Sequence, residues 1–174
     1  MKPAVFLDRD GVLCEERGYI ICKEQMKIFP FVKQAIERLH HKGYLAICIT
    51  NQSAVARGML TEVQLKEIND YLIQYVGLDA LYYCPHHESG AAPYNLRCEC
   101  RKPGIGMIKT AVKDWNIDLT KSYMVGDRAS DILCGEAAGI KTILLETGYG
   151  TARMEQKVQP DAIYEDLNIF SCEV

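Results

Sequence analysis

Four short stretches of the sequence bring together carboxylates, hydroxyls, amides and cations. They are Asp8-Arg9-Asp10-Gly11, Thr50-Asn51-Gln52-Ser53, Arg101-Lys102 and Gly126-Asp127-Arg128-Ala129-Ser130-Asp131. Carboxylates with open positions beside them suit Mg²⁺, which binds them together with water and substrate phosphate. Lysine, arginine and hydroxyl groups donate hydrogen bonds to phosphoryl oxygens. The four stretches therefore predict phosphoryl-transfer chemistry at a magnesium site.

The two aspartates of the first stretch are expected to have different roles. An aspartate close to a metal, a cation and a hydroxyl can attack phosphorus, and we expect Asp8 to do so and form an aspartyl-phosphate. Asp10 would protonate the leaving oxygen and then deprotonate the attacking water. Mg²⁺, held by Asp8, Asp10 and Asp127, would neutralise the phosphoryl charge together with Lys102. The sequence leaves open whether Asp131 binds Mg²⁺ or supports Asp127.

A second constellation lies between residues 84 and 100 and consists of Cys84, His86, Cys98 and Cys100. Three thiolates and one imidazole form a closed tetrahedral ligand set for Zn²⁺, and closed zinc sites are structural. Such an ion would order a long loop and hold Arg101, the residue after the last ligand. The spacing alone does not decide between His86 and its neighbour His87 as the imidazole ligand.

The elements that must position these groups follow from the apolar patterns. Short apolar runs predict buried strands, and residues spaced by three and four predict amphipathic helices. Strands are expected at 4–7, 44–49, 78–83, 122–125, 141–145 and 162–164, and helices at 30–43, from 61 onward, at 108–115 and at 131–138. Strands that alternate with helices predict a doubly wound, mainly parallel α/β sheet with helices on both faces.

The same alternation predicts where the polar stretches meet. Ligands of such sheets bind beyond the carboxyl ends of the strands, and each of the four stretches follows a predicted strand. The segment between Asn51 and Arg101 has room for one helix, one strand and the zinc loop of residues 84–100. We therefore expect a single domain, residues 1–174, without a large cap domain and with an open crevice.

The composition excludes several other classes of protein. The chain has 174 residues, of which 48% are hydrophobic and 25% charged, and its net charge is −3. This charge gives no general attraction for nucleic acid, and no apolar run approaches the length needed to cross a membrane. The eight cysteines are not read as a disulfide scaffold, since a chain of this size can bury its own core. A cytoplasmic monomer is expected.

The motifs "FLDRDGV", "ITNQS", "RKPGIGM" and "VGDRASD" resemble, in this order, the signature motifs of the haloacid dehalogenase superfamily. An acid two residues after the nucleophile resembles the phosphatase branch. The stretches "GYI", "TNQSAVARG", "YYCPHH" and "CECRKPGIGM" further resemble the D-glycero-D-manno-heptose 1,7-bisphosphate phosphatase family and the related histidinol-phosphatase domain. The resemblance extends over residues 4 to 150.

The resemblance implies a function and several roles. It implies Mg²⁺-dependent removal of the C7 phosphate of the heptose bisphosphate in bacterial surface-polysaccharide synthesis, with a structural zinc. Thr50 and Lys102 would stabilise the phosphoryl group and Arg101 would recognise the substrate. Substrate contacts would come from Glu16, Arg17, Gly18, Tyr19, Asn51, Gln52, Ser53 and Arg128, the last of which is a lysine in many relatives. Histidinol-phosphate hydrolysis and a non-catalytic zinc and phosphate-binding scaffold are the alternatives.

Overall fold

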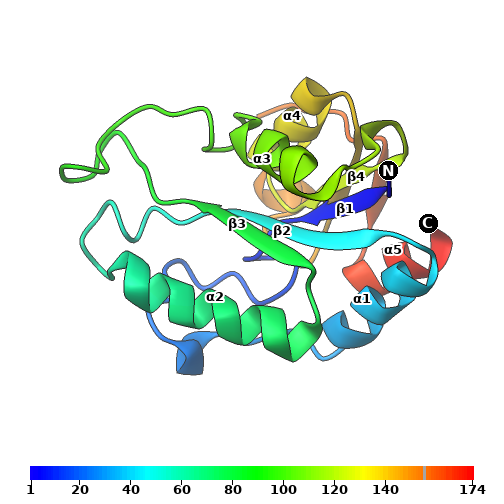
Figure 1. Cartoon of the computed structure of the whole chain (residues 1–174), viewed down its shortest axis with the longest axis horizontal. Coiled ribbons are helices and arrows are strands. Elements are labelled where there is room, and N and C mark those ends of the chain that lie inside the picture. Colours follow the sequence, from blue (N-terminus) through cyan, green and yellow to red (C-terminus); the bar gives the residue numbers. More distant parts are fainter. Residues whose placement is uncertain (155) are drawn as a thin grey trace.

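The computed structural model describes residues 1–154 and 156–174, and within them lies a six-stranded parallel sheet (Figure 1). Its strands have the order β3-β2-β1-β4-β5-β6. Their bounds are Ala4–Leu7 for β1, Leu45–Asn51 for β2, Ala80–Cys84 for β3, Tyr123–Gly126 for β4, Lys141–Leu145 for β5 and Ala162–Tyr164 for β6. This sheet confirms the predicted doubly wound α/β fold.

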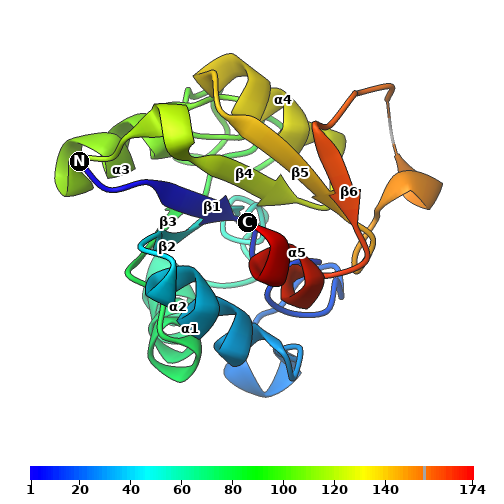
Figure 2. The same cartoon turned by 90° about the vertical axis from the view of Figure 1, so that its right-hand side faces the viewer.

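Helices cover both faces of the sheet (Figure 2). On one face lie α1 (Val32–His41), α2 (Glu62–Val76) and α5 (Leu167–Glu173), and on the other lie α3 (Gly106–Trp115) and α4 (Ala129–Ala138). Short 3-10 turns occur at Lys23–Gln25, Leu119–Lys121 and Thr151–Arg153. Along β1, Val5 and Leu7 enter one apolar core while Ala4 and Phe6 enter the other. This double burial explains why the strand is apolar throughout.

The helices differ from the sequence expectation in where they begin, and one of them was not expected. Helices α3 and α4 each begin two residues before the predicted 108 and 131. Helix α1 begins at Val32, because Pro30 lies in a preceding turn in which the Val32 N–H donates to the Phe29 carbonyl (3.1 Å). Helix α5 was not predicted, since its seven residues are too few to show a helical period. The Asp166 side chain accepts from the Ile169 N–H (2.9 Å) and caps its first turn. The predicted capping box at the start of α2 is present.

Strand β2 is longer than predicted, and this affects the site. Thr50 and Asn51 were expected in a loop, but they pair in register with Tyr83 and Cys84 of β3. Sequence propensity did not show this, because the two polar residues follow an apolar run that already has the length of a strand. Both side chains are therefore presented from a hydrogen-bonded strand end.

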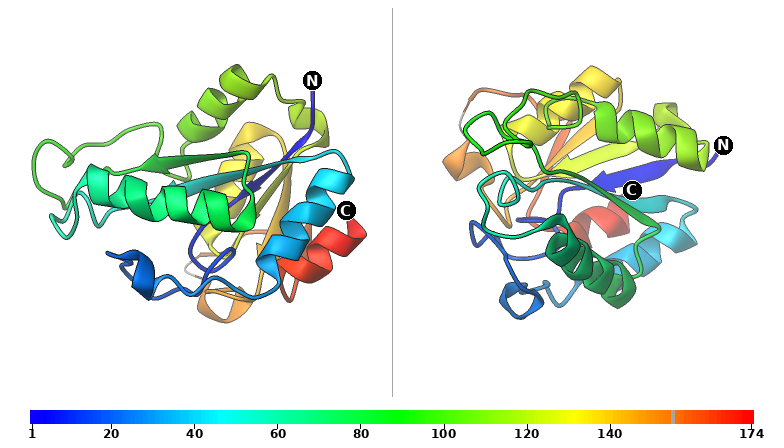
Figure 3. Two further views of the ribbon diagram at one scale, coloured as in Figure 1. Left: turned by 60° about the horizontal axis from the view of Figure 1, so that its bottom comes forward. Right: turned by 60° about the vertical axis from the view of Figure 1, so that its left-hand side comes forward.

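The loops that follow the strands gather at one edge of the sheet. Figure 3 shows the segment between β3 and α3 projecting beyond this edge beside the loop after β2. The Ala91 N–H donates to the Ala56 carbonyl (2.7 Å) and joins these two loops. As predicted, α2 is the helix between β2 and β3, and no cap domain occurs in the described chain. None of the described helices combines the length and apolar character required to cross a bilayer.

Candidate active site

Three carboxylates meet at the carboxyl ends of β1 and β4. Asp8 follows β1, Asp127 follows β4, and Asp131 comes from the first turn of α4. One carboxylate oxygen from each residue lies within 4.8 Å of those of the other two, and all three residues are buried. Like charges at this distance repel strongly when water is excluded, so the group requires a cation.

Lys102 supplies one positive charge to this group. Its Nζ lies 3.0 Å from Asp8 Oδ1 and 2.7 Å from Asp131 Oδ1, and its side chain is 1% exposed. Burial alone would lower the pKa of Lys102, but the charges of Asp131 and Asp8 outweigh it and the pKa is raised. The Asn51 side-chain amide holds the Lys102 main chain on both sides, donating to its carbonyl (3.1 Å) and accepting from its N–H (3.0 Å).

Asp127 has the surroundings of a metal ligand. Its Oδ2 accepts from the Tyr149 N–H (2.7 Å), while its Oδ1 is buried and has no hydrogen-bond partner among the described residues. A Cβ at Gly11 or at Gly148 would overlap the Asp127 carboxylate, so two glycines make room for it. An unpaired buried carboxylate oxygen is costly, and a bound cation would remove that cost. The carboxylate group therefore fits Mg²⁺, a hard ion with oxygen ligands.

The site favours protonated carboxyl groups when no second cation is bound. Burial raises the pKa of Asp8 to about 6, with Lys102 opposing the shift and Asp131 adding to it. Burial raises the pKa of Asp127 to about 8, with further increases from Asp131 and Asp8. A divalent cation would stabilise the charged forms of both groups.

Asp10 lies outside the group of three carboxylates. Its two oxygens accept from the Arg9 guanidinium at 2.9 to 3.2 Å, and Oδ2 also accepts from Gln52 Nε2 (3.0 Å). Gln52 Nε2 donates as well to Thr50 Oγ1 (2.9 Å). Asp10 was predicted as a magnesium contact, but the carboxylate that joins Asp8 and Asp127 is that of Asp131.

A cavity of about 440 Å³ opens above these groups. Its wall contains most of the predicted substrate residues together with four that the sequence analysis did not assign to it. The lining residues are Asp8, Asp10, Glu16, Gly18, Tyr19, Thr50, Asn51, Gln52, Ser53, Arg57, His87, Arg101, Lys102, Arg128, Ser130 and Tyr149. Arg17 is absent from this lining; its half-exposed guanidinium pairs with Glu15 (2.9 Å).

The outer wall of the cavity is rich in cationic and aromatic side chains. Arg128 Nη2 lies 3.0 Å from Glu16 Oε2, and its guanidinium lies 3.7 Å from the centre of the Tyr149 ring. Arg57 lies 5.8 Å from the centre of the Tyr19 ring. Glu16 also accepts from the Gly18 N–H (2.7 Å). These contacts join the loops after β1, β2, β4 and β5 around one opening.

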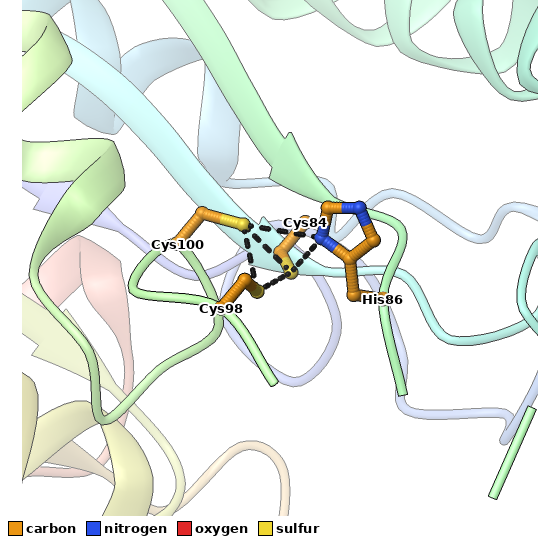
Figure 4. Close-up of side chains that lie close together, drawn as sticks. All are labelled: Cys84, His86, Cys98 and Cys100. Atoms are coloured by element: carbon orange, nitrogen blue, oxygen red, sulfur yellow. Dashed lines mark hydrogen bonds between the residues drawn. The ribbon is translucent and has the colours of Figure 1, made fainter. Parts of the chain in front are cut away.

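The four predicted zinc ligands converge in one cluster (Figure 4). The three Sγ atoms of Cys84, Cys98 and Cys100 are 3.0 to 3.4 Å apart, too far for a disulfide, and His86 Nδ1 lies 3.7 and 3.5 Å from the Sγ atoms of Cys84 and Cys100. His87 points elsewhere: its Nδ1 accepts from the Ser89 N–H (3.1 Å). The structure therefore selects His86 as the imidazole of this cluster.

Known proteins with similar sequences identify the family. The D-glycero-beta-D-manno-heptose-1,7-bisphosphate 7-phosphatase of Haemophilus ducreyi is 44% identical over 164 residues, which cover 90% of each chain. The chain belongs to this phosphatase family. The Escherichia coli K12 protein of the same name is 37% identical over 153 residues, covering 84% of this chain and 80% of that protein. A HAD-hydrolase-like family model matches residues 99–169.

A solved structure agrees with membership of the heptose-bisphosphate phosphatase family. The D,D-heptose 1,7-bisphosphate phosphatase of B. bronchiseptica, complexed with magnesium and phosphate, superposes with a TM-score of 0.86 at 28% identity. The match covers 98% of this chain and 97% of that one. These relatives confirm the resemblance read from the sequence and make the protein a phosphatase. Because they are named for the heptose substrate, they do not favour the histidinol-phosphate alternative.

Four residues line the cavity although the sequence did not predict them there: Arg57, His87, Ser130 and Tyr149. Tyr149 follows β5, so the rule that located the other stretches also applies to it. Ser130 lies within the fourth stretch itself. Arg57 and His87 come from the two projecting loops, whose positions cannot be read from a residue pattern.

Proposed function

We propose that the protein hydrolyses the C7 phosphate of D-glycero-beta-D-manno-heptose 1,7-bisphosphate through an aspartyl-phosphate on Asp8. The observation that carries this proposal is a cavity with two different ends. Its base holds a nucleophile and Lys102, and its outer wall holds Arg57, Arg101 and His87. A sugar with two phosphate groups has the matching distribution of charge. The relatives are named for this sugar and for its beta anomer, and these names support the proposed substrate.

The base of the cavity supports attack by Asp8. Within the described residues, Asp8 Oδ1 accepts from the Arg9 N–H (2.7 Å) and pairs with Lys102, while Oδ2 makes no such contact. The second oxygen is therefore left to attack phosphorus. Lys102 and Thr50 would donate to the phosphoryl oxygens as the bond to the leaving oxygen breaks.

Mg²⁺ would be held by Asp8 and Asp127, with Asp131 either as a ligand or as a support for Lys102. The bound ion would supply positive charge opposite the phosphoryl oxygens. In the orientation seen here, a contact from Asp10 to the ion would need its main-chain oxygen or a turn of its side chain, because Arg9 and Gln52 occupy the carboxylate. Asp10 would act instead on the proton of the leaving oxygen and later on that of water.

The outer wall argues for a second phosphate on the substrate. Arg57 Nη2 lies 3.5 Å from His87 Nε2, and Arg101 Nη1 donates to the His86 carbonyl (3.2 Å), so two guanidinium groups lie on the two projecting loops beside the neutral His87 ring. Histidinol phosphate carries a positive amine where the heptose bisphosphate carries its C1 phosphate. Like charges would disfavour that compound at the outer wall.

Zn²⁺ would occupy the cluster of Cys84, His86, Cys98 and Cys100. Its role would be structural, since four protein ligands leave no open position for substrate. The ion would fix the residue after the last ligand, and this places Arg101 at the cavity. All eight cysteines are free, which suits a reducing cytoplasm, and we expect a monomer there.

Steady-state kinetics with the purified, zinc-loaded protein and Mg²⁺ test this function. We expect the beta anomer of the heptose bisphosphate to have a kcat/KM well above those of the alpha anomer, heptose 7-phosphate and histidinol phosphate. Asp8→Asn, which keeps the size of the side chain but removes the nucleophile, should abolish turnover with a folded protein. Equal rates on all four compounds would refute the substrate, and a near-normal rate in Asp8→Asn would refute the nucleophile.

A further inference from the structure

The buried residue Arg9 stands between the nucleophile and the acid in the sequence. Its side chain is 1% exposed, and a guanidinium without partners is very costly in such a place. Asp10 compensates its charge: Arg9 Nε lies 3.2 Å from both carboxylate oxygens, and Nη2 lies 3.1 and 2.9 Å from them. The planar fork of the guanidinium therefore fixes both oxygens of Asp10.

Arg9 has a second partner on helix α2. Its Nη1 donates to Asn69 Oδ1 (3.3 Å), and Asn69 is 3% exposed on the core-facing side of the helix with Leu65 and Leu72. Asn69 Nδ2 has no hydrogen-bond partner among the described residues. An amide at such a position costs stability, so an apolar residue would serve the core better. The hydrogen bond to Arg9 explains why an amide occupies this core position.

We propose that Arg9 and Asn69 are positioning residues of the phosphatase reaction, which hold the Asp10 carboxylate where it transfers the proton to the leaving oxygen. This inference rests on the proposed role of Asp10. Without Asn69, the Nη1 group of Arg9 loses its acceptor and the guanidinium can turn within the core. The remaining partners of the carboxylate would then be Gln52 Nε2, 3.0 Å from Oδ2, and the Cys14 thiol, 3.5 Å from Oδ1, and neither has the charge or the planar fork of the guanidinium.

The leaving group distinguishes positioning from a merely structural role. A sugar alkoxide leaves only if it receives a proton, whereas p-nitrophenolate is stable enough to leave without one. The value of kcat/KM contains the steps up to release of the alcohol or phenol. It therefore excludes the later hydrolysis of the aspartyl-phosphate, in which Asp10 would act as a base. A misplaced Asp10 should lower kcat/KM for the sugar phosphate alone.

The experiment compares Asn69→Ala with Leu72→Ala, which removes a buried apolar side chain of the same helix that offers Arg9 no hydrogen-bond acceptor. For Asn69→Ala we expect kcat/KM for the heptose bisphosphate to fall by about tenfold or more. The value for p-nitrophenyl phosphate should change by less than about twofold. Leu72→Ala should change both values in the same proportion. Thermal unfolding reports the loss of stability in each variant.

An equal change of both substrates in Asn69→Ala, or no change, would overturn the inference. Arg9→Lys gives a second reading if Asn69→Ala does not fold, because it keeps the charge but loses the fork; it should show the same selective loss. If the wild-type protein cleaves p-nitrophenyl phosphate and glycerol phosphate but not the heptose bisphosphate, the proposed substrate is wrong. The comparison is then made with glycerol phosphate, so the two failures can be told apart.

Discussion

The stability of the protein without Mg²⁺ should fall as the pH rises, chiefly because of Asp127. Folding raises the pKa of this buried carboxyl from 3.8 to about 8, so the folded chain keeps a proton that the unfolded chain has lost. Its stabilising contribution is complete below pH 3.8 and is lost as the pH rises to about 8. Asp8 contributes in the same sense up to pH about 6.

Between pH 6 and 8, Asp127 is therefore the principal carboxyl of the site that still changes its proton content. One bound proton changes the free energy of unfolding by about 1.4 kcal/mol per pH unit, so the expected loss is about 2 to 3 kcal/mol over this range. Saturating Mg²⁺ should abolish the slope, because the ion stabilises the charged carboxylates. Stabilisation by Mg²⁺ should consequently increase with pH.

Urea unfolding at pH 6, 7 and 8 measures this effect, with and without added Mg²⁺. Mg²⁺ is left out of the buffers rather than chelated, because a chelator would also remove zinc. Asp127→Asn is the matched variant: its amide cannot titrate, so its stability without Mg²⁺ should vary much less with pH. Equal slopes in the two proteins, or a stabilisation by Mg²⁺ that decreases with pH, would refute the account of Asp127.

Two substitutions test the surroundings of the metal sites. Gly148→Ala places a Cβ against the Asp127 carboxylate, so the Mg²⁺ concentration needed for half-maximal activity should rise by about tenfold or more while the protein stays folded. An unchanged Mg²⁺ requirement would show that the space left by Gly148 is not needed for the position of Asp127. Cys98→Ser removes one of the four ligands, so zinc per chain measured by metal analysis and the melting temperature should both fall. Cys172→Ser, at an exposed cysteine outside the cluster, is its control, and equal zinc in the two variants would exclude the site.

The sheet could be predicted because its strands carry their own signal. Residues 4–7 are apolar throughout, and this pattern is typical of a parallel strand that is buried on both faces. The position of the active site followed from the same pattern, since functional groups of such sheets lie after the strands. The short helix α5 gave no comparable signal, because its place depends on packing: Arg38 Nε of α1 donates to Ser171 Oγ (3.0 Å) across a long sequence distance.

The orientation of side chains was beyond the reach of the sequence. Asp10 and Asp131 are both aspartates near strand ends, and spacing made Asp10 the more obvious partner of Asp8. The structure shows Asp131 beside Asp8, joined to it by Lys102, while Asp10 is turned toward Arg9. The buried cations determine these orientations, since Arg9 pairs with Asp10 and Lys102 pairs with Asp131.

That distribution also gives the two aspartates of the first stretch different surroundings. Asp8 is buried and shares the positive charge of Lys102 with Asp131. Part of its negative charge is therefore not neutralised until Mg²⁺ binds. Asp10 has Arg9 to itself and keeps 15% of its side chain exposed at the cavity. A group that exchanges protons with substrate and water needs such access, whereas a nucleophile needs a fixed position beside the metal. The residue between the two aspartates thus helps to separate their roles.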